Sequence, residues 1–149
     1  AVALTTIAPM ARTNADKTVN AEFRFLLRHL RELPADAEIH YVYPRTSFGD
    51  MALVAQPELS SFLLRPGHRW VRWSPGTPPS GAPRFFYLQA GCWSRDPDGA
   101  GDRVLCREAD AAYRDRPFIE AWLPSATRCE APYEGDRVRV GFYRMDPVR

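Results

Sequence analysis

Apolar residues recur at three- and four-residue steps between residues 19 and 33, and this spacing predicts an amphipathic helix. The stripe comprises Val19, Phe23, Leu26, Leu27, Leu30 and Leu33. Asn20 is the expected N-cap, Glu22 suits the positive first turn, and Pro34 is expected to end the helix. The next segment, residues 38–43, is rich in β-branched and aromatic residues, which predicts a strand. A helix with one apolar stripe must cover an apolar surface, so we expect this strand to lie beneath it.

The rest of the chain alternates between apolar runs and segments rich in proline, glycine and aspartate. Further strands are predicted at residues 1–9, 68–73, 84–93, 118–123 and 138–143, with residues 84–93 at the centre of the sheet. Further helices are predicted at residues 57–65 and 104–114. Residues 45–50, 74–83, 94–102 and 127–137 are expected to form loops. No helix signal separates the last two strands, which favours antiparallel pairing between them.

This order of elements predicts one α/β domain over residues 1–149, with a strand and linker at 1–18 and a core at 19–149. We expect a two-layer or three-layer sandwich with helices flanking the sheet. The sheet is expected to be mostly parallel or mixed, and Rossmann-like. In such sheets, ligands usually bind at the loops that follow the carboxyl ends of the strands.

Composition narrows the function classes only slightly. The 149 residues carry a net charge of +2, and this balance does not favour a nucleic-acid binder. All but one of the 20 basic residues are arginine, as expected for a GC-rich bacterial genome. The sequence opens at Ala1 without methionine, so we expect either a mature chain with its leader removed or a domain excised from a longer protein.

Three cysteines leave two interpretations open. Cys92 ends the predicted central strand, and Cys106 begins the predicted helix after a short Gly/Asp-rich loop, so a disulfide could join them. By loop-closure arithmetic, such a bond is worth roughly 2–3 kcal/mol. Cys129 would then be left over. The alternative is three reduced, unrelated thiols, because the count is odd and the compartment is unknown.

The sequence predicts no metal, cofactor or catalytic set. Aspartates at 96, 98 and 102 suggest a calcium loop, but Ala100 and Arg107 stand where its essential oxygen ligands would be, so an ordinary turn is favoured. None of the three histidines, at 29, 40 and 68, has a second ligand at metal-binding spacing, and a structural role is favoured for each.

Five residues are candidates for ligand binding. Arg45 and Asp50 lie in the loop after the first clear strand. Arg69, Trp70 and Arg72 alternate along another predicted strand and offer guanidinium and indole groups to an anionic or sugar ligand. The alternative is an edge strand whose arginines prevent unwanted strand pairing.

The helix–strand segment NAEFRFLLRHLRELPADAEIHYVYP resembles the soluble extracytoplasmic domain of bacterial multi-spanning membrane glycosyltransferases. The segment VRVGFYRM near the C-terminus is similar to the C-terminal domains of the same proteins, and so is the Cys-Trp strand end followed by a second cysteine. The catalytic acids of that family lie in membrane loops to which nothing here corresponds. The resemblance therefore implies an accessory domain and carries over no active-site residue.

We expect a non-catalytic domain that is extracytoplasmic, or periplasmic, and tethered to a membrane by a segment upstream. Its expected partners are the parent membrane domain and a lipid-linked sugar or a protein acceptor. Whether the chain is an enzyme stays open. One alternative is a small stand-alone enzyme in which the loops after residues 38–43 and 84–93 converge, bringing together Arg45, Ser47, Asp50, Asp96 and Asp98. Another is an interaction subunit with an exposed patch of Phe48, Met51, Trp70 and Trp73.

Overall fold

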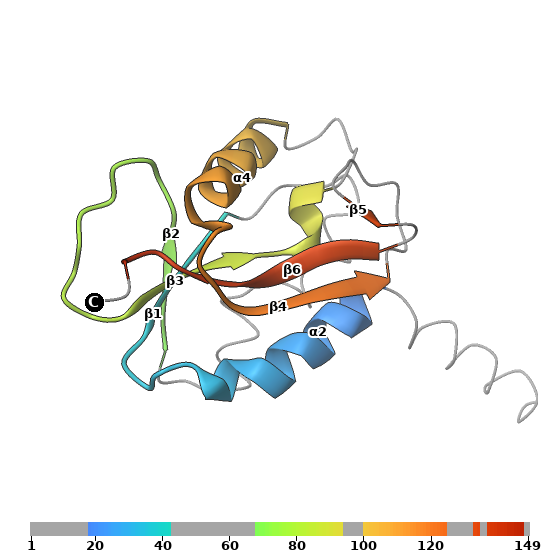
Figure 1. Cartoon of the computed structure of the whole chain (residues 1–149), viewed down its shortest axis with the longest axis horizontal. Coiled ribbons are helices and arrows are strands. Elements are labelled where there is room, and N and C mark those ends of the chain that lie inside the picture. Colours follow the sequence, from blue (N-terminus) through green and yellow to red (C-terminus); the bar gives the residue numbers. More distant parts are fainter. Residues whose placement is uncertain (1–17, 43–67, 94–99, 125–132, 135–136, 148–149) are drawn as a thin grey trace, which may run out of the picture.

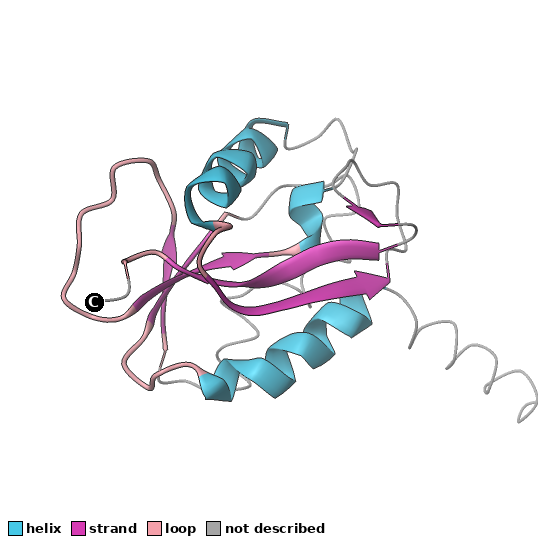
Figure 2. Ribbon diagram, in the orientation of Figure 1, coloured by secondary structure: helices cyan, strands magenta, loops and turns pink. Residues whose placement is uncertain are grey.

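The computed structural model describes residues 18–42, 68–93, 100–124, 133–134 and 137–147. The described elements form an α/β fold with a mixed sheet (Figures 1 and 2). They are α2 (Thr18–His29), η1 (Leu30–Glu32), β1 (Glu38–Tyr41), β2 (Arg69–Arg72), β3 (Arg84–Leu88), η3 (Ala90–Trp93), α4 (Ala100–Tyr113), β4 (Pro117–Pro124), β5 (Tyr133–Glu134) and β6 (Arg137–Arg144). The α/β class predicted from the sequence is therefore confirmed.

Five strands lie in the order β2-β1-β3-β6-β4, and the short β5 pairs with β6. Strand β1 runs parallel to both β2 and β3, whereas β6 is antiparallel to both β3 and β4. The antiparallel pairing expected for the last two long strands is thus confirmed. The connection between β2 and β3 contains no helix, although it joins parallel strands on either side of β1.

The two long helices lie on opposite sides of the sheet (Figure 1). On the α2 side, the ring of Phe25 stacks on Phe142 of β6, which in turn stacks on Tyr87 of β3. On the α4 side, Tyr113 packs against Phe86 of β3. Successive strand residues face opposite sides, so β3, which is buried throughout, supplies apolar groups to both. Strand β1 is also buried, but it directs Ile39 and Tyr41 to the α2 side and its polar residues to the α4 side.

The apolar face of α2 differs from the predicted one. Leu26, Leu30 and Leu33 are buried as expected, but Leu27 is 45% exposed and Phe25 takes its place. At about 100° per residue, Phe25 falls on the face shared by the buried residues Ala21, Glu22 and Leu26, whereas Leu27 lies nearly opposite this face. The helix begins at Thr18, so the prediction of Asn20 as the N-cap was wrong.

Two predicted boundaries also shift. The central strand ends at Leu88 and gives way to η3, so Cys92 lies on a 3-10 turn and not on a strand. Helix α4 begins at Ala100, so Cys106 lies within the helix and does not open it. The predicted strand at residues 1–9 and the predicted helix at 57–65 lie outside the described residues.

Candidate functional site

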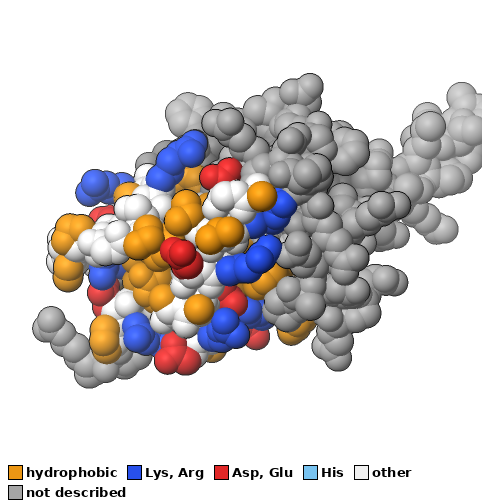
Figure 3. Space-filling view, turned by 90° about the horizontal axis from the view of Figure 1, so that it is seen from above, with side chains coloured by type: hydrophobic (Ala, Val, Ile, Leu, Met, Phe, Trp, Pro, Cys, Tyr) orange, Lys and Arg blue, Asp and Glu red, His pale blue; other side chains and the backbone are white. Residues whose placement is uncertain are grey.

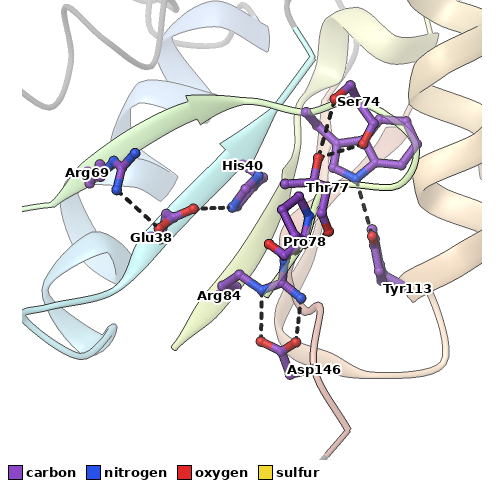
Figure 4. Close-up of polar contacts among 10 residues, drawn as sticks. Glu38, His40, Arg69, Ser74, Thr77, Pro78, Arg84, Tyr113 and Asp146 are labelled. Atoms are coloured by element: carbon purple, nitrogen blue, oxygen red, sulfur yellow. Dashed lines mark hydrogen bonds and ion pairs between the residues drawn. The ribbon is translucent and has the colours of Figure 1, made fainter. Parts of the chain in front are cut away.

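A row of charges crosses the beginning of the three parallel strands. Glu38 of β1 is in register with Arg69 of β2 on one side and with Arg84 of β3 on the other. The Glu38 carboxylate lies 3.7 Å from the Arg69 guanidinium and 2.8 Å from Nε2 of His40 (Figure 4). With Asp146, these four residues form what we call the polar cluster.

Arg84 connects three parts of the chain within this cluster. Its guanidinium donates two hydrogen bonds to the Asp146 carboxylate, at 3.0 and 2.5 Å. It also donates to the carbonyl oxygens of Thr77 and Pro78 in the β2–β3 connection (Figure 4). The arginine holds the pKa of Asp146 below its ordinary value. A single buried guanidinium thus attaches both this connection and the C-terminal segment to β3.

His40 is fully enclosed. Its Nε2 is hydrogen-bonded to Glu38, and its buried Nδ1 has no hydrogen-bond partner among the described residues. Burial lowers the pKa of His40, and the nearby Glu38 opposes this shift only partly. A carboxylate that orients an imidazole is an arrangement used for general base catalysis, but such a base must reach its substrate. With no exposed surface, His40 is better described as a structural residue, the role that the sequence favours.

A second acid lies at the opposite ends of the parallel strands. Glu22 of α2 is only 3% exposed and accepts hydrogen bonds from the Tyr87 hydroxyl at 2.5 Å and from the Ala90 N–H at 3.1 Å. Next to it, the Gln89 side-chain amide donates to the carbonyl of Val42, which follows β1. Burial raises the pKa of Glu22 to about 7, although both hydrogen bonds act in the opposite direction.

The sequence pattern placed Glu22 in the first turn of the helix, which was wrong because α2 begins at Thr18, and its buried role was not predicted. One signal pointed to burial: Glu22 precedes Phe25 and Leu26 by three and four residues, so it shares their face. A glutamate is usually exposed, whereas the position of Glu22 on the apolar face of α2 favours burial. The Tyr87 hydroxyl and the Ala90 N–H, which come from a distant segment, satisfy the carboxyl group in this buried position.

A third network attaches α4 and η3 to β6. Arg139 donates to Asp110 of α4 at 2.7 Å and to the Tyr143 hydroxyl at 3.2 Å, and its carbonyl accepts the Trp93 indole N–H at 2.7 Å. The Tyr143 hydroxyl in turn donates to Glu120 at 2.7 Å. The Arg139–Tyr143 bond lies within β6, and the other three each join two elements of the fold, so the network explains how α4, η3 and β4 are attached to β6.

The disulfide predicted between Cys92 and Cys106 is supported by the structure. The two residues lie at disulfide distance, with 5.7 Å between their Cα atoms, and both are buried. The pair joins η3 to α4. Cys129 lies outside the described residues.

The predicted ligand-binding residues on β2 do not form one continuous face. Arg69 and Arg72 are exposed, whereas Trp70 is half-buried and packs edge-on against Tyr41 and Tyr87. Arg69 points to the α4 side with Glu38, while Trp70 and Arg72 point to the α2 side. Arg45 and Asp50 lie outside the described residues.

The predicted exposed aromatic patch is wrong at Trp73. This residue is 8% exposed, packs against Phe86 and Tyr113, and donates its indole N–H to the Tyr113 hydroxyl at 3.2 Å. Strand β2 ends at Arg72, and Trp73 turns into the space below α4. Phe48 and Met51, the other proposed members of the patch, lie outside the described residues, as do Ser47, Asp96 and Asp98 of the alternative enzyme site.

The surface on the α4 side mixes charges of both signs with apolar groups (Figure 3). No group of histidine, cysteine, aspartate and glutamate suited to a metal ion occurs within the described parts of the chain. Across the same residues, none of the helices combines the length and the apolar character that a membrane span requires.

Comparison with known proteins provides no further assignment. No protein-family model matches the sequence, and no curated protein or solved structure shows significant similarity to it. The function must therefore be argued from the residues and contacts described above.

Proposed function

We propose that this is a non-catalytic binding domain of a bacterial membrane glycosyltransferase-like protein, located outside the cytoplasm. In this proposal, it helps to hold a lipid-linked sugar or a protein acceptor for the parent membrane domain. The binding surface is the edge strand β2, whose exposed Arg69 and Arg72 project from opposite faces of the sheet on either side of its outer edge.

The main support for binding over catalysis is how the ionisable groups inside the fold are used. Glu22, Glu38 and Arg84 each make hydrogen bonds or ion pairs that connect separate elements of the chain. A catalytic acid or base needs access to its substrate, and these groups are buried. By contrast, the two arginines of β2 present guanidinium groups to solvent, and guanidinium recognises phosphate and carboxylate groups well.

Support for the location is chemical. A disulfide between Cys92 and Cys106 is stable in oxidising compartments and rare in the cytosol. The resemblance of the helix–strand segment to extracytoplasmic glycosyltransferase domains points the same way. The proposal also includes a Rossmann-like sandwich, because the connection from β1 to β2 comprises residues 43–67, outside the described part. It further includes the membrane tether upstream of the domain.

The proposal is tested by vesicle binding. The domain, purified under oxidising conditions, is mixed with phosphatidylcholine vesicles that do or do not contain a polyprenyl-phosphate sugar. We expect sedimentation with the loaded vesicles, reduced in the double variant R69Q/R72Q. The double variant R28Q/R137Q removes two exposed arginines elsewhere and is the matched control. Equal binding by both variants would contradict the role of β2.

The compartment is tested separately by mass spectrometry without reductant. We expect a peptide pair joined through Cys92 and Cys106 after digestion of protein isolated from its native compartment. Free thiols at both positions would count against the extracytoplasmic location, whatever the vesicle assay shows.

A further inference from the structure

Strand β2 forms one edge of the sheet, and its outer edge has no partner among the described residues. On its inner edge, the N–H groups of Arg69 and Trp73 donate to the carbonyls of Ala37 and Tyr41. In a parallel strand, the N–H and C=O of one residue point to the same side, and alternate residues point to opposite sides. Trp70 and Arg72 therefore direct their backbone N–H and C=O groups outward, away from β1.

The charged side chains along this edge are both positive. Arg69 is 76% exposed and Arg72 is also exposed, and β2 contains no acidic residue. Among the described residues, Arg69 forms an ion pair with Glu38, at 3.7 Å. An ion pair with so exposed a partner is weak, so the Arg69 guanidinium can exchange this contact for another carboxylate.

We infer that β2 accepts an extended acidic segment of a partner protein as an additional strand of the sheet. The backbone groups of Trp70 and Arg72 supply its hydrogen bonds, and the two arginines select its charge. This inference rests on the proposed function and narrows it, because it assigns the backbone edge of β2 to a protein acceptor, whereas a lipid-linked sugar would contact only the arginine side chains.

The spacing of the arginines defines the segment. Arg69 and Arg72 are three positions apart, so they project from opposite faces of the sheet. A strand paired with β2, in either direction, matches both charges when it carries two carboxylates three positions apart. Cross-strand pairs of opposite charge stabilise a sheet, and like charges directly opposite destabilise it.

The same rule argues against a second copy of this chain as the occupant. In an antiparallel pair of two β2 strands, the outward-bonding residues of one copy lie opposite those of the other, so Arg72 meets Trp70 or Arg72 and finds no carboxylate. Two copies would therefore gather four arginines along one edge without an acidic residue of β2 between them. The edge is therefore suited to an acidic partner and unsuited to self-association.

The test uses the blocked peptide Val-Glu-Val-Thr-Glu-Val and nitrogen-15 NMR of the oxidised domain. We expect saturable shifts and slowed hydrogen exchange at the amides of Trp70 and Arg72. The amide of Arg69, which already donates to β1, is expected to change little. A peptide of the same composition with adjacent glutamates, and one with lysine in place of glutamate, are expected to bind more weakly.

Two variants separate charge from backbone pairing. Arg72→Gln removes one guanidinium and is expected to weaken peptide binding by about two- to five-fold. Arg72→Pro also removes an outward N–H that β1 does not use, and is expected to weaken binding by a further five-fold or so. Far-UV circular dichroism checks that both variants fold. If the proline variant does not fold, backbone pairing is judged from the unmodified domain, in which the amides of Trp70 and Arg72 are expected to shift and that of Arg69 is not.

Three outcomes would overturn the inference. The first is the absence of saturable shifts at Trp70 and Arg72, and the second is equal binding of the lysine peptide. The third is a concentration-dependent dimer in sedimentation that Arg72→Pro abolishes, because a second copy would then occupy the edge. If the vesicle assay succeeds and the peptide fails, the proposed function stands and this inference falls.

Discussion

Replacing Glu22 by glutamine is expected to make the protein more stable at high pH and to leave its stability unchanged at low pH. The Glu22 carboxyl group is buried, and no described side chain forms an ion pair with it. Burial raises its pKa from 4.5 to about 7. In the folded protein, the group therefore remains protonated at pH values where the unfolded chain has already released the proton.

The sign follows from proton linkage. Between pH 4.5 and 7, the unfolded state binds fewer protons at this residue than the folded state, so the free energy of unfolding falls as pH rises. The difference, 7 minus 4.5, corresponds to about 3 kcal/mol at 1.36 kcal/mol per pH unit. The contribution of Glu22 is fully present below pH 4.5 and lost once pH exceeds 7. Glutamine is uncharged at every pH, like the protonated acid, so E22Q keeps this contribution to the free energy of unfolding as pH rises.

The assay is urea unfolding of the oxidised protein, followed by circular dichroism between pH 4.5 and 8.5. We expect the stability of E22Q relative to the unmodified protein to rise by about 3 kcal/mol across this range. We compare the two proteins at each pH because His40 changes the free energy of unfolding with pH in the opposite direction. Its lowered pKa makes stability fall as pH drops below 6.5 in both proteins alike, so subtraction removes this effect.

Glu108→Gln is the control, because this exposed carboxylate lies on α4. It is expected to change stability by no more than about 0.5 kcal/mol at any pH tested. The reasoning is refuted if E22Q and the unmodified protein differ by the same amount at every pH. It is also refuted if E22Q loses stability relative to the unmodified protein as pH rises, which would mean that the fold favours the carboxylate.

Three further predictions concern stability. Gly141→Ala is expected to destabilise the protein by about 1–3 kcal/mol in urea unfolding, because its Cβ would lie 2.5 Å from a backbone oxygen of β4; Gly101→Ala, which meets open space, should not. Replacing Cys92 and Cys106 together by serine is expected to cost about 3 kcal/mol, and an unchanged urea midpoint without reductant would show that no bond forms. Asp146→Asn is expected to lower the melting temperature at pH 7, because it removes the carboxylate that pairs with Arg84 and has a lowered pKa. The effect is expected to shrink as pH falls below 3.8, and a constant difference in melting temperature between pH 7 and 2 would contradict this.

Much of the secondary structure could be read from the sequence, because local patterns carry it. The strands predicted at 118–123 and 138–143 occur at 117–124 and 137–144, and the helix predicted at 104–114 occurs at 100–113. Apolar alternation and helical spacing arise from the geometry of the chain itself. The first and last residues of these elements were less predictable, since they depend on contacts with other parts of the protein.

The candidate sites were predictable only where a residue is both exposed and chemically distinctive. Arg69 and Arg72 are exposed, as expected for charged residues on an edge strand. Trp73 lies on the same side of the sheet as Arg69 and is nevertheless buried, because Phe86 of β3 and Tyr113 of α4 form a space for its ring. Local pattern therefore identifies which residues have useful chemistry, without showing which of them reach the surface.

The sequence by itself determined the α/β class, most of the strands, and the two cysteines that can meet across a short loop. The tertiary structure alone decided that Glu22 turns inward to Tyr87, 65 residues away, and that Arg84 pairs with Asp146 across 62 residues. The physical reason is that a polar group is buried only when a partner satisfies it, and the partner is positioned by the whole fold.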